Sequence, residues 1–314
     1  MVATTPTAPA AAAPPAAPPA RRRQPLPYVL LVPAIAVLAL ALGYPLVRQV
    51  VMSFQEYGLA QQFGAEPVWV GLDNYRQLVT DPYLWQVVAR SIAFCLVNAA
   101  VTMVIGVALA VLMTTLSRTV RLGLQIALLL AWAMPWLASL TVWQWMFDTQ
   151  YGVVNWLLVQ MGLDFGGHSW LIQPLSFFFV ATVIVVWMSV PFVAFSTYAA
   201  LTQVPSDTIE AAELDGAGGW QRFRYVVVPM IKPVLMIVGL LQIIWDLRVF
   251  TQIFVLQDAG GITRETNLIG TYVYRLGIGE GQFGMAAAVA IFILLLTVGL
   301  TFVYIRRLMA QEAL

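Results

Sequence analysis

The residues best placed to do chemistry are an aspartate and an arginine inside an otherwise apolar run. Asp246 and Arg248 interrupt a stretch that extends from Val234 to about Val255. A charged side chain within a membrane span is costly, and it usually faces a cavity or another polar group. Residues two apart do not face each other on a helix, so each is expected to find its partner elsewhere. Contact with a polar solute and ion pairing between helices or subunits are both open.

The same run has a polar and aromatic face. Helical geometry at about 100° per residue gathers these side chains on one side: Gln242, Trp245, Asp246, Arg248 and Gln252. The aliphatic residues Ile243 and Leu247 fall on the opposite side. The pattern predicts a two-faced helix whose polar side lines a pathway or braces it.

Further candidates for such a pathway lie in the neighbouring apolar runs. They are Asn98, Trp132, Trp136 and Trp187. Indole faces stack well on the C–H faces of sugars, but aromatic rings also pack helices together, and the sequence leaves both roles open. Pro135 and Pro191 are expected to kink their helices and free backbone carbonyls, which a membrane tolerates only where protein or a cavity covers them.

Residues for catalysis or metal binding are scarce. Cys95 is the single cysteine and lies in an apolar run, which excludes a disulfide framework and a cysteine-rich metal site. His168, the single histidine, follows two glycines and is expected to be an ordinary surface residue. No Gly-x-x-x-x-Gly-Lys-Ser/Thr run is present, so this chain is not an ATPase. We predict no catalytic residue, no metal site and no cofactor bound by the chain itself.

The elements that must position these residues are membrane helices. Of the 314 residues, 61% are hydrophobic and only 10% are charged, against roughly 25% charged in a soluble domain. The net charge of +1 gives no reason to expect a nucleic-acid partner. Uncharged runs long enough to cross a bilayer predict an all-α, polytopic membrane protein of six helices. The expected spans are about 28–51, 91–114, 122–146, 175–201, 233–255 and 282–305.

The ends of the chain set its expected orientation. Residues 1–24 are rich in Ala and Pro and are predicted to be a disordered tail before a membrane domain at 25–314. Ala39-Leu40-Ala41 imitates a signal-peptide cleavage site, but the apolar stretch from Tyr28 is long enough to span and is expected to be retained. Basic residues are more numerous on the side that also holds both termini, which predicts cytoplasmic termini.

One polar loop, 204–233, separates two apolar runs on that cytoplasmic side. Asp207 and Glu210 have the spacing of a capping box, which predicts a short helix from about Thr208 to Asp215. Gly216 is expected to end this helix with a positive φ. A second short helix is predicted from Trp220 to Val228, before Pro229 and Pro233 at the entry to the next run.

This loop resembles the cytoplasmic EAA loop of ATP-binding cassette (ABC) importer permeases. The matching positions are Glu210, Ala211, Ala212 and Gly216, followed by Val226, Val228 and Pro229. The resemblance implies that the helix ending at Asp215 is a coupling helix, which docks in a groove of an ATPase subunit.

Two other segments are similar to the maltose-type carbohydrate permeases. They are Asp246-Leu247-Arg248-Val249-Phe250 with the apolar run after it, and Gly71-Leu72-Asp73-Asn74-Tyr75. The family's Thr-Gly-Gly-Gly-Pro turn is replaced by residues 257–261, which weakens any inference about the particular sugar. The chain thus looks like the F-type permease of a sugar importer, with the type I ABC importer architecture and a cytoplasmic coupling helix.

That resemblance also implies the partners and the location. A second homologous permease, an ATPase dimer that binds ATP and Mg, and an extracellular solute-binding protein would assemble with the chain. The complex would lie in a bacterial cytoplasmic membrane and import a di- or oligosaccharide. A secondary transporter, a membrane-embedded enzyme and an ABC importer of glycerol phosphates or another polyol are the alternatives. The first would need more intramembrane carboxylates and repeat symmetry, and the second would need clustered acidic or histidine residues.

Overall fold

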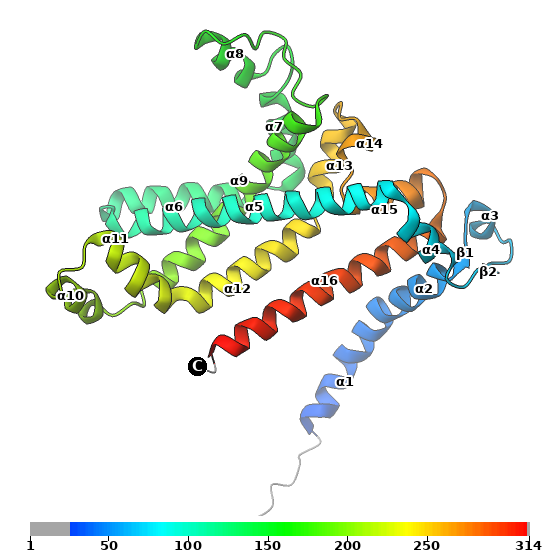
Figure 1. The fold of residues 1–314 in the computed structure, drawn as a ribbon, viewed down its shortest axis with the longest axis horizontal. Helices are drawn as coiled ribbons and strands as arrows, with labels where there is room; N and C mark the ends of the chain where they lie inside the picture. The colour runs from blue at the N-terminus through cyan, green and yellow to red at the C-terminus, as the bar shows by residue number, and fades with distance from the viewer. Residues whose placement is uncertain (1–25, 313–314) are drawn as a thin grey trace, which may run out of the picture. The chain divides into compact units, whose positions relative to one another are not determined.

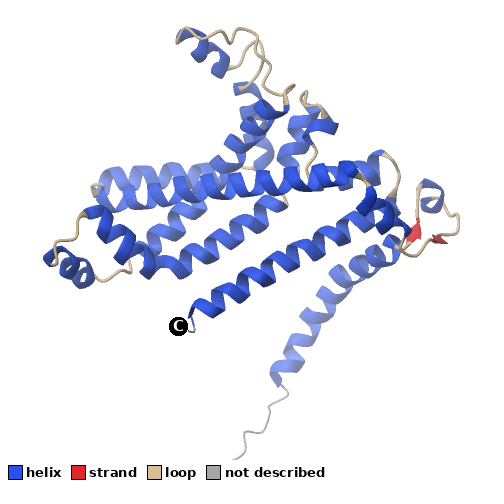
Figure 2. Ribbon diagram, in the orientation of Figure 1, coloured by secondary structure: helices blue, strands red, loops and turns tan. Residues whose placement is uncertain are grey.

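The protein is almost entirely helical in a computed structural model that describes residues 26–312 (Figure 2). Within this range the strands are limited to one short antiparallel pair, β1 (Gln55–Glu56) and β2 (Val68–Trp69), with Gln55 opposite Trp69. The predicted all-α class is therefore confirmed. The predicted disordered tail, 1–24, lies outside the described residues.

The chain divides after Arg48 into two compact units. The first contains α1 (Leu26–Leu38), a π-helical turn at Ala39–Gly43 and the start of α2 (Tyr44–Ser53). Leu30–Ser53 is long and apolar enough to cross a membrane, in agreement with the first predicted span. Pro33 lies inside α1 without ending it.

The second unit contains three further helices of spanning length. They are α5 (Pro82–Thr115), α9 (Pro174–Leu201) and a run that begins at Gly219 and ends at Asp258. A broken pair, α6 (Arg118–Ala133) and α7 (Trp136–Met146), adds one span if it is counted as such. In α16 (Phe283–Glu312) the described apolar part is the shorter Phe283–Gly299. The described residues thus give four or five spans, and a total of six stays a prediction.

Shorter elements connect these helices. They are α3 (Leu59–Gln62), α4 (Asp73–Thr80), α8 (Val153–Gln160), α10 (Ser206–Leu214), α11 (Gly219–Arg222), a π turn (Phe223–Val227), α12 (Val228–Leu247), α13 (Thr251–Asp258), α14 (Thr263–Thr266), α15 (Ile269–Tyr274) and a π turn (Arg275–Gly279). Figure 1 shows α11 at one end of α12 and α13 at the other.

The helix α5 begins earlier than the predicted span at 91–114. Asp81 precedes it, and its carboxylate accepts a hydrogen bond of 2.8 Å from the backbone N–H of Tyr83. Pro82 takes the first helical position, where its missing N–H costs nothing. A cap and a proline together explain why the helix extends beyond its apolar part.

The core of the second unit forms where α9 packs on α5, α7 and α13. Fully buried side chains from α7, α9 and α13 meet there, among them Leu140, Phe177, Ile184 and Ile253. The helices α5 and α9 approach so closely that a Cβ added at Gly106 would lie 2.5 Å from Cγ1 of Val193. Small residues permit this backbone approach, which drives helix association in membranes through van der Waals packing.

Asn74, within the carbohydrate-permease-like segment 71–75, holds the segment before it. The buried Asn74 side-chain amide donates to the backbone carbonyls of Ser53 and Gln55, both at 2.9 Å. The Tyr75 hydroxyl donates to Oγ of Ser53 at 2.7 Å. This segment therefore closes a loop of the fold and has a structural role.

Candidate functional site

Two helix breaks shape the candidate site. α6 and α7 are bent by 101°, with Met134 extended (φ −67°, ψ 130°) before Pro135. A residue before proline avoids the helical region, and proline cannot donate the helical hydrogen bond. The predicted third span, 122–146, is therefore a broken pair of helices, and the kink expected at Pro135 is present.

The second break separates α12 from α13. α12 ends at Leu247, and the chain turns through Arg248 to Phe250 before α13 begins at Thr251. The predicted fifth span, 233–255, lies within the spanning run Gly219–Asp258, but the prediction of one regular helix is wrong because the helix is interrupted after Leu247. Neither glycine nor proline stands at this break, so the apolar pattern carried no signal for it.

A cavity of about 740 Å³ lies where the two breaks and α9 meet. Its lining comes from the end of α6, the start of α7, the middle of α9 and the α12–α13 break. The polar and aromatic members are Trp132, Trp136, Ser189, Phe192, Trp245, Asp246, Arg248, Phe250, Thr251 and Gln252. This volume and mixed lining are those of a small-molecule site.

The cavity brings together most of the predicted pathway residues but not all of them. Trp132, Trp136, Trp245, Asp246, Arg248 and Gln252 line it. Asn98, Trp187 and Gln242 do not, and their lining role stays without structural support. Contact between the lining residues and a transported solute stays a prediction.

Asp246 has its partner on its own helix. The side-chain amide of Gln242 donates to both carboxylate oxygens, at 3.0 Å and 3.1 Å, and both residues are buried. The expectation that Asp246 is paired elsewhere is therefore wrong, because residues four apart on a helix are neighbours. Arg248 is exposed at the cavity and forms no ion pair within residues 26–312.

The helix ends at the two breaks also leave backbone groups without helical partners. The first turn of a helix has N–H groups without helical partners, and Thr251 and Gln252 of α13 stand in the lining. The last turn of α6, with Ala131 and Ala133, likewise contributes carbonyl groups. Together with exposed indole faces, these donors and acceptors suit a hydroxyl-rich solute.

The remaining aromatic and amide candidates have packing roles. Trp187 meets Trp143 edge-to-face, with ring centroids 5.7 Å apart, and Trp143 stacks on Phe147 at 6.1 Å. Trp143 thus packs against the core. The Asn98 amide donates to the backbone carbonyl of Phe94 at 2.7 Å within α5. Packing, one of the two roles the sequence left open, accounts for Trp187.

The predicted coupling helix is α10, at the end of the fold that Figure 1 shows beside α11. It begins at Ser206 after Pro205, and no side chain caps it. The predicted capping box of Asp207 and Glu210 is therefore wrong, because Asp207 already lies in the first helical turn. An ion pair between Glu213 and Arg222 links α10 to α11 instead.

The end of α10 agrees with prediction. Asp215 is the C-cap residue, and Gly216 has φ +79°, the left-handed value that favours glycine. The predicted second helix, Trp220–Val228, is instead the continuous beginning of α12, which passes through a π turn. Pro229 lies directly after the π turn, inside this continuous helical path.

The loop around α10 exposes two large apolar side chains beside its charged residues. Glu210, Ala211, Asp215, Gly216 and Pro229 are exposed, and Ala212 is half-buried. Leu214 is 90% exposed and Trp220 is 72% exposed. Large apolar side chains this exposed suit contact with another protein.

The comparison with protein families identifies the class of transport protein to which the chain belongs. Residues 102–307 match the family described as binding-protein-dependent transport system inner membrane component. The chain belongs to this family. It is accordingly a multi-pass membrane component of an ABC transport system, which replaces the alternatives of a secondary transporter and a membrane-embedded enzyme.

Curated relatives extend over nearly the whole chain. The diacetylchitobiose uptake system permease protein DasB of Streptomyces coelicolor is 43% identical over 287 residues, which cover 91% of this chain and 87% of that protein. The trehalose/maltose transport system permease protein MalF of Thermococcus litoralis is 29% identical over 287 residues, covering 91% and 94%. The predicted resemblance to sugar permeases is confirmed.

A solved structure shares the fold. The match is a chain in the crystal structure of a bacterial ABC transporter involved in the import of the acidic polysaccharide alginate. The TM-score is 0.78 at 21% identity, with 91% of this chain and 95% of that chain covered. This confirms the predicted type I importer permease architecture at the level of the fold.

Proposed function

We propose that this chain is one of two homologous permease subunits of an ATP-driven importer for a neutral di- or oligosaccharide. The observation that carries the proposal is the cavity of about 740 Å³ at the two helix breaks, lined by Trp132, Trp136 and Trp245. Indole faces and backbone polar groups recognise sugars by stacking and hydrogen bonding. The names of the relatives point to the same class of cargo.

The charges of the cavity favour a neutral cargo over glycerol phosphates. Arg248 is the one cation among the described lining residues, and the buried carboxylate of Asp246 lines the same cavity. A phosphate-binding site would be expected to gather several cationic donors.

The proposed mechanism couples α10 to the cavity. An ATPase dimer, with ATP and Mg bound to its subunits, would receive α10 in a surface groove. Closure of the dimer would move α10 and turn the cavity toward the outside, where a solute-binding protein delivers the sugar. Such coupling requires that α10 contacts the ATPase differently in the two states.

The proposed location is a bacterial cytoplasmic membrane with both termini in the cytoplasm. The excess of basic residues on the proposed inner side supports this orientation. Arg222, Arg224 and Lys232 contribute to it, and they surround the loop that would meet the ATPase. Cysteines introduced at either terminus should therefore react with a membrane-impermeant maleimide only after the cells are opened.

Import of labelled sugars into proteoliposomes tests this function. The complex with its ATPase, second permease and solute-binding protein should accumulate N,N′-diacetylchitobiose, maltose or trehalose only when ATP is enclosed. The isolated chain should not be photolabelled by an ATP analogue. Sugar accumulation without the ATPase, or import of glycerol phosphate alone, would contradict the proposal.

Asp246→Leu tests the role of the cavity. The substitution removes the acceptor of the Gln242 amide, which is fully buried and would be left unsatisfied. We expect sugar import to fall by roughly tenfold or more at equal membrane abundance, the effect of about 1–3 kcal/mol. Phe254→Leu is the control, because Phe254 packs on Phe250 and Tyr274 and does not line the cavity. Equal import by both variants would mean that the Asp246 side of the cavity has no part in transport.

A further inference from the structure

A second place with carbohydrate-binding chemistry lies outside the long helices, between α7 and α9. Two clefts of about 360 Å³ and 500 Å³ lie there, and Trp145 lines both of them. The first extends along Ser169 and Leu171 to Ala259 and Gly260, after α13. The second extends along α8 to Trp156 and Gly166. Trp145 and Thr149 are therefore the residues that the two clefts share.

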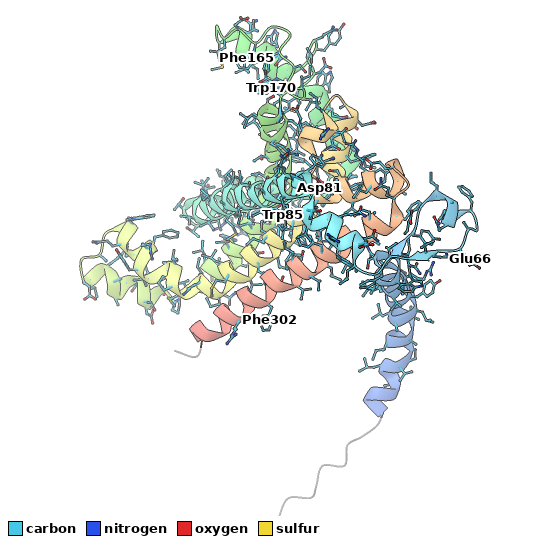
Figure 3. All side chains as sticks on the ribbon, turned by 45° about the vertical axis from the view of Figure 1, so that its right-hand side comes forward. Glu66, Asp81, Trp85, Phe165, Trp170 and Phe302 are labelled. Atoms are coloured by element: carbon cyan, nitrogen blue, oxygen red, sulfur yellow. The ribbon has the colours of Figure 1, made fainter. Side chains whose placement is uncertain are left out.

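The segment that carries the clefts is held in one arrangement by Asn155. Its side-chain amide donates to the backbone carbonyls of His168 and Thr149, at 2.9 Å and 3.2 Å. Its Oδ1 accepts a hydrogen bond of 2.6 Å from the indole N–H of Trp170. Trp170 in turn stacks on Phe165, with ring centroids 5.5 Å apart, and both are labelled in Figure 3. A prearranged site loses little free energy to ordering when a ligand binds.

The clefts contain almost no charge. Asp148 is the one charged residue among the described lining residues. Its Oδ1 accepts hydrogen bonds from the backbone N–H groups of Gln150 and Tyr151, at 2.8 Å and 2.7 Å. These bonds lower the pKa of the Asp148 carboxyl, so the group is ionised near neutral pH. Its Oδ1 is already bound by backbone N–H groups of the same segment. An anionic ligand would find no cationic side chain among these lining residues.

What the clefts do offer is aromatic surface beside neutral polar groups. Trp145 is 61% exposed, Trp156 is 59% exposed and Tyr151 is 78% exposed. Gln144 also lines the first cleft, and its amide N–H donates to the backbone carbonyl of Val255 at 3.0 Å. Aromatic faces with amides and hydroxyls at their edges bind the C–H faces and hydroxyl groups of sugars.

We propose that the two clefts around Trp145 form a carbohydrate-binding subsite outside the transmembrane cavity. Each cleft takes a sugar ring against one side of the indole, and the neutral polar groups bind hydroxyls. The subsite receives cargo before it enters the cavity lined by Asp246. This inference rests on the proposed function, because it takes a sugar as the cargo.

Fluorine NMR of the full chain, labelled with fluorotryptophan and held in nanodiscs, tests the subsite. Spectra of Trp145→Phe and Trp156→Phe assign the two reporter resonances. Titration with N,N′-diacetylchitobiose should shift both resonances saturably. In Trp145→Ala the Trp156 resonance should titrate at a roughly three- to tenfold higher sugar concentration, the loss expected for one stacking contact. Trp69, which is 65% exposed and lines neither cleft, is the control and should not shift.

Unmoved Trp145 and Trp156 resonances at saturating sugar would overturn the subsite, and so would an equal shift at Trp69. An indole that only lies at the lipid headgroup level predicts the first of these results. The import assay keeps this result apart from the proposed function. If the complex imports sugar but the Trp145 resonance does not shift, the subsite is excluded and the proposed function is unaffected.

Discussion

Complexes that carry Gly216→Val are expected to reach the membrane intact and yet to lose nearly all sugar import and substrate-stimulated ATP hydrolysis. Gly216 has φ +79° and no atom within 4 Å of an added Cβ, so a side chain has room. The cost arises in the backbone, because a β-branched residue disfavours the left-handed region by about 1–3 kcal/mol. The chain would relieve this strain by unwinding the end of α10, which displaces Ala211 and Ala212.

Two controls separate coupling from folding in this experiment. Gly216→Asn should keep most of the activity, because asparagine tolerates the left-handed conformation. Gly64→Val places the same residue at another open glycine of positive φ, 106°, far along the chain from α10, and should leave ATP hydrolysis unchanged. Wild-type import and hydrolysis by Gly216→Val, measured in proteoliposomes, would show that α10 is not the coupling helix.

Gly106→Leu should prevent the chain from folding and assembling. The added side chain would collide with Val193, whose Cγ1 lies 2.5 Å from the first new atom, and with the backbone of Ala194. Neither neighbour can move away, because Val193 and Ala194 are fully buried in the α5–α9 contact. Overpacking of this kind costs about 1–3 kcal/mol or more.

The measurement is the amount of monodisperse chain extracted from the membrane and its melting temperature in detergent. Gly123→Leu is the matched control, since Gly123 lies in α6 with no atom within 4 Å of an added Cβ. It should be extracted in wild-type amount. Similar losses in both variants would mean that leucine harms insertion in general and that the α5–α9 contact is not the cause.

The sequence predicted the loop at 204–233 better than the cavity, for a physical reason. A position that needs a left-handed backbone is commonly a glycine, so Gly216 could be predicted from its residue type and its spacing. A break such as the one after Leu247 depends on how α9 and α13 pack around it, and the local residues give no sign. Pro135 is an intermediate case, because the sequence predicted a kink there but not a bend of 101°.

The partners of buried polar groups show the same limit. Asp246 and Gln242 are spaced as helical neighbours, so their hydrogen bonds could have been predicted from the sequence. Asn155 could not, because its partners Thr149, His168 and Trp170 meet only when the segment between α7 and α9 folds back. The clefts around Trp145 follow from that fold-back and were missed for this reason.

The unbroken helical path from Gly219 to Leu247 has a mechanical consequence. α11, the π turn and α12 follow one another over roughly 40 Å without a non-helical residue, but the π turn and Pro233 interrupt the regular hydrogen bonding and let the path bend. One end is tied to α10 by the ion pair of Glu213 and Arg222, and the other carries Asp246. A tilt imposed at the first end is therefore shared between bending at the π turn and movement of the second end. The stiffness of that bend would set how far the cavity moves for a given movement of α10.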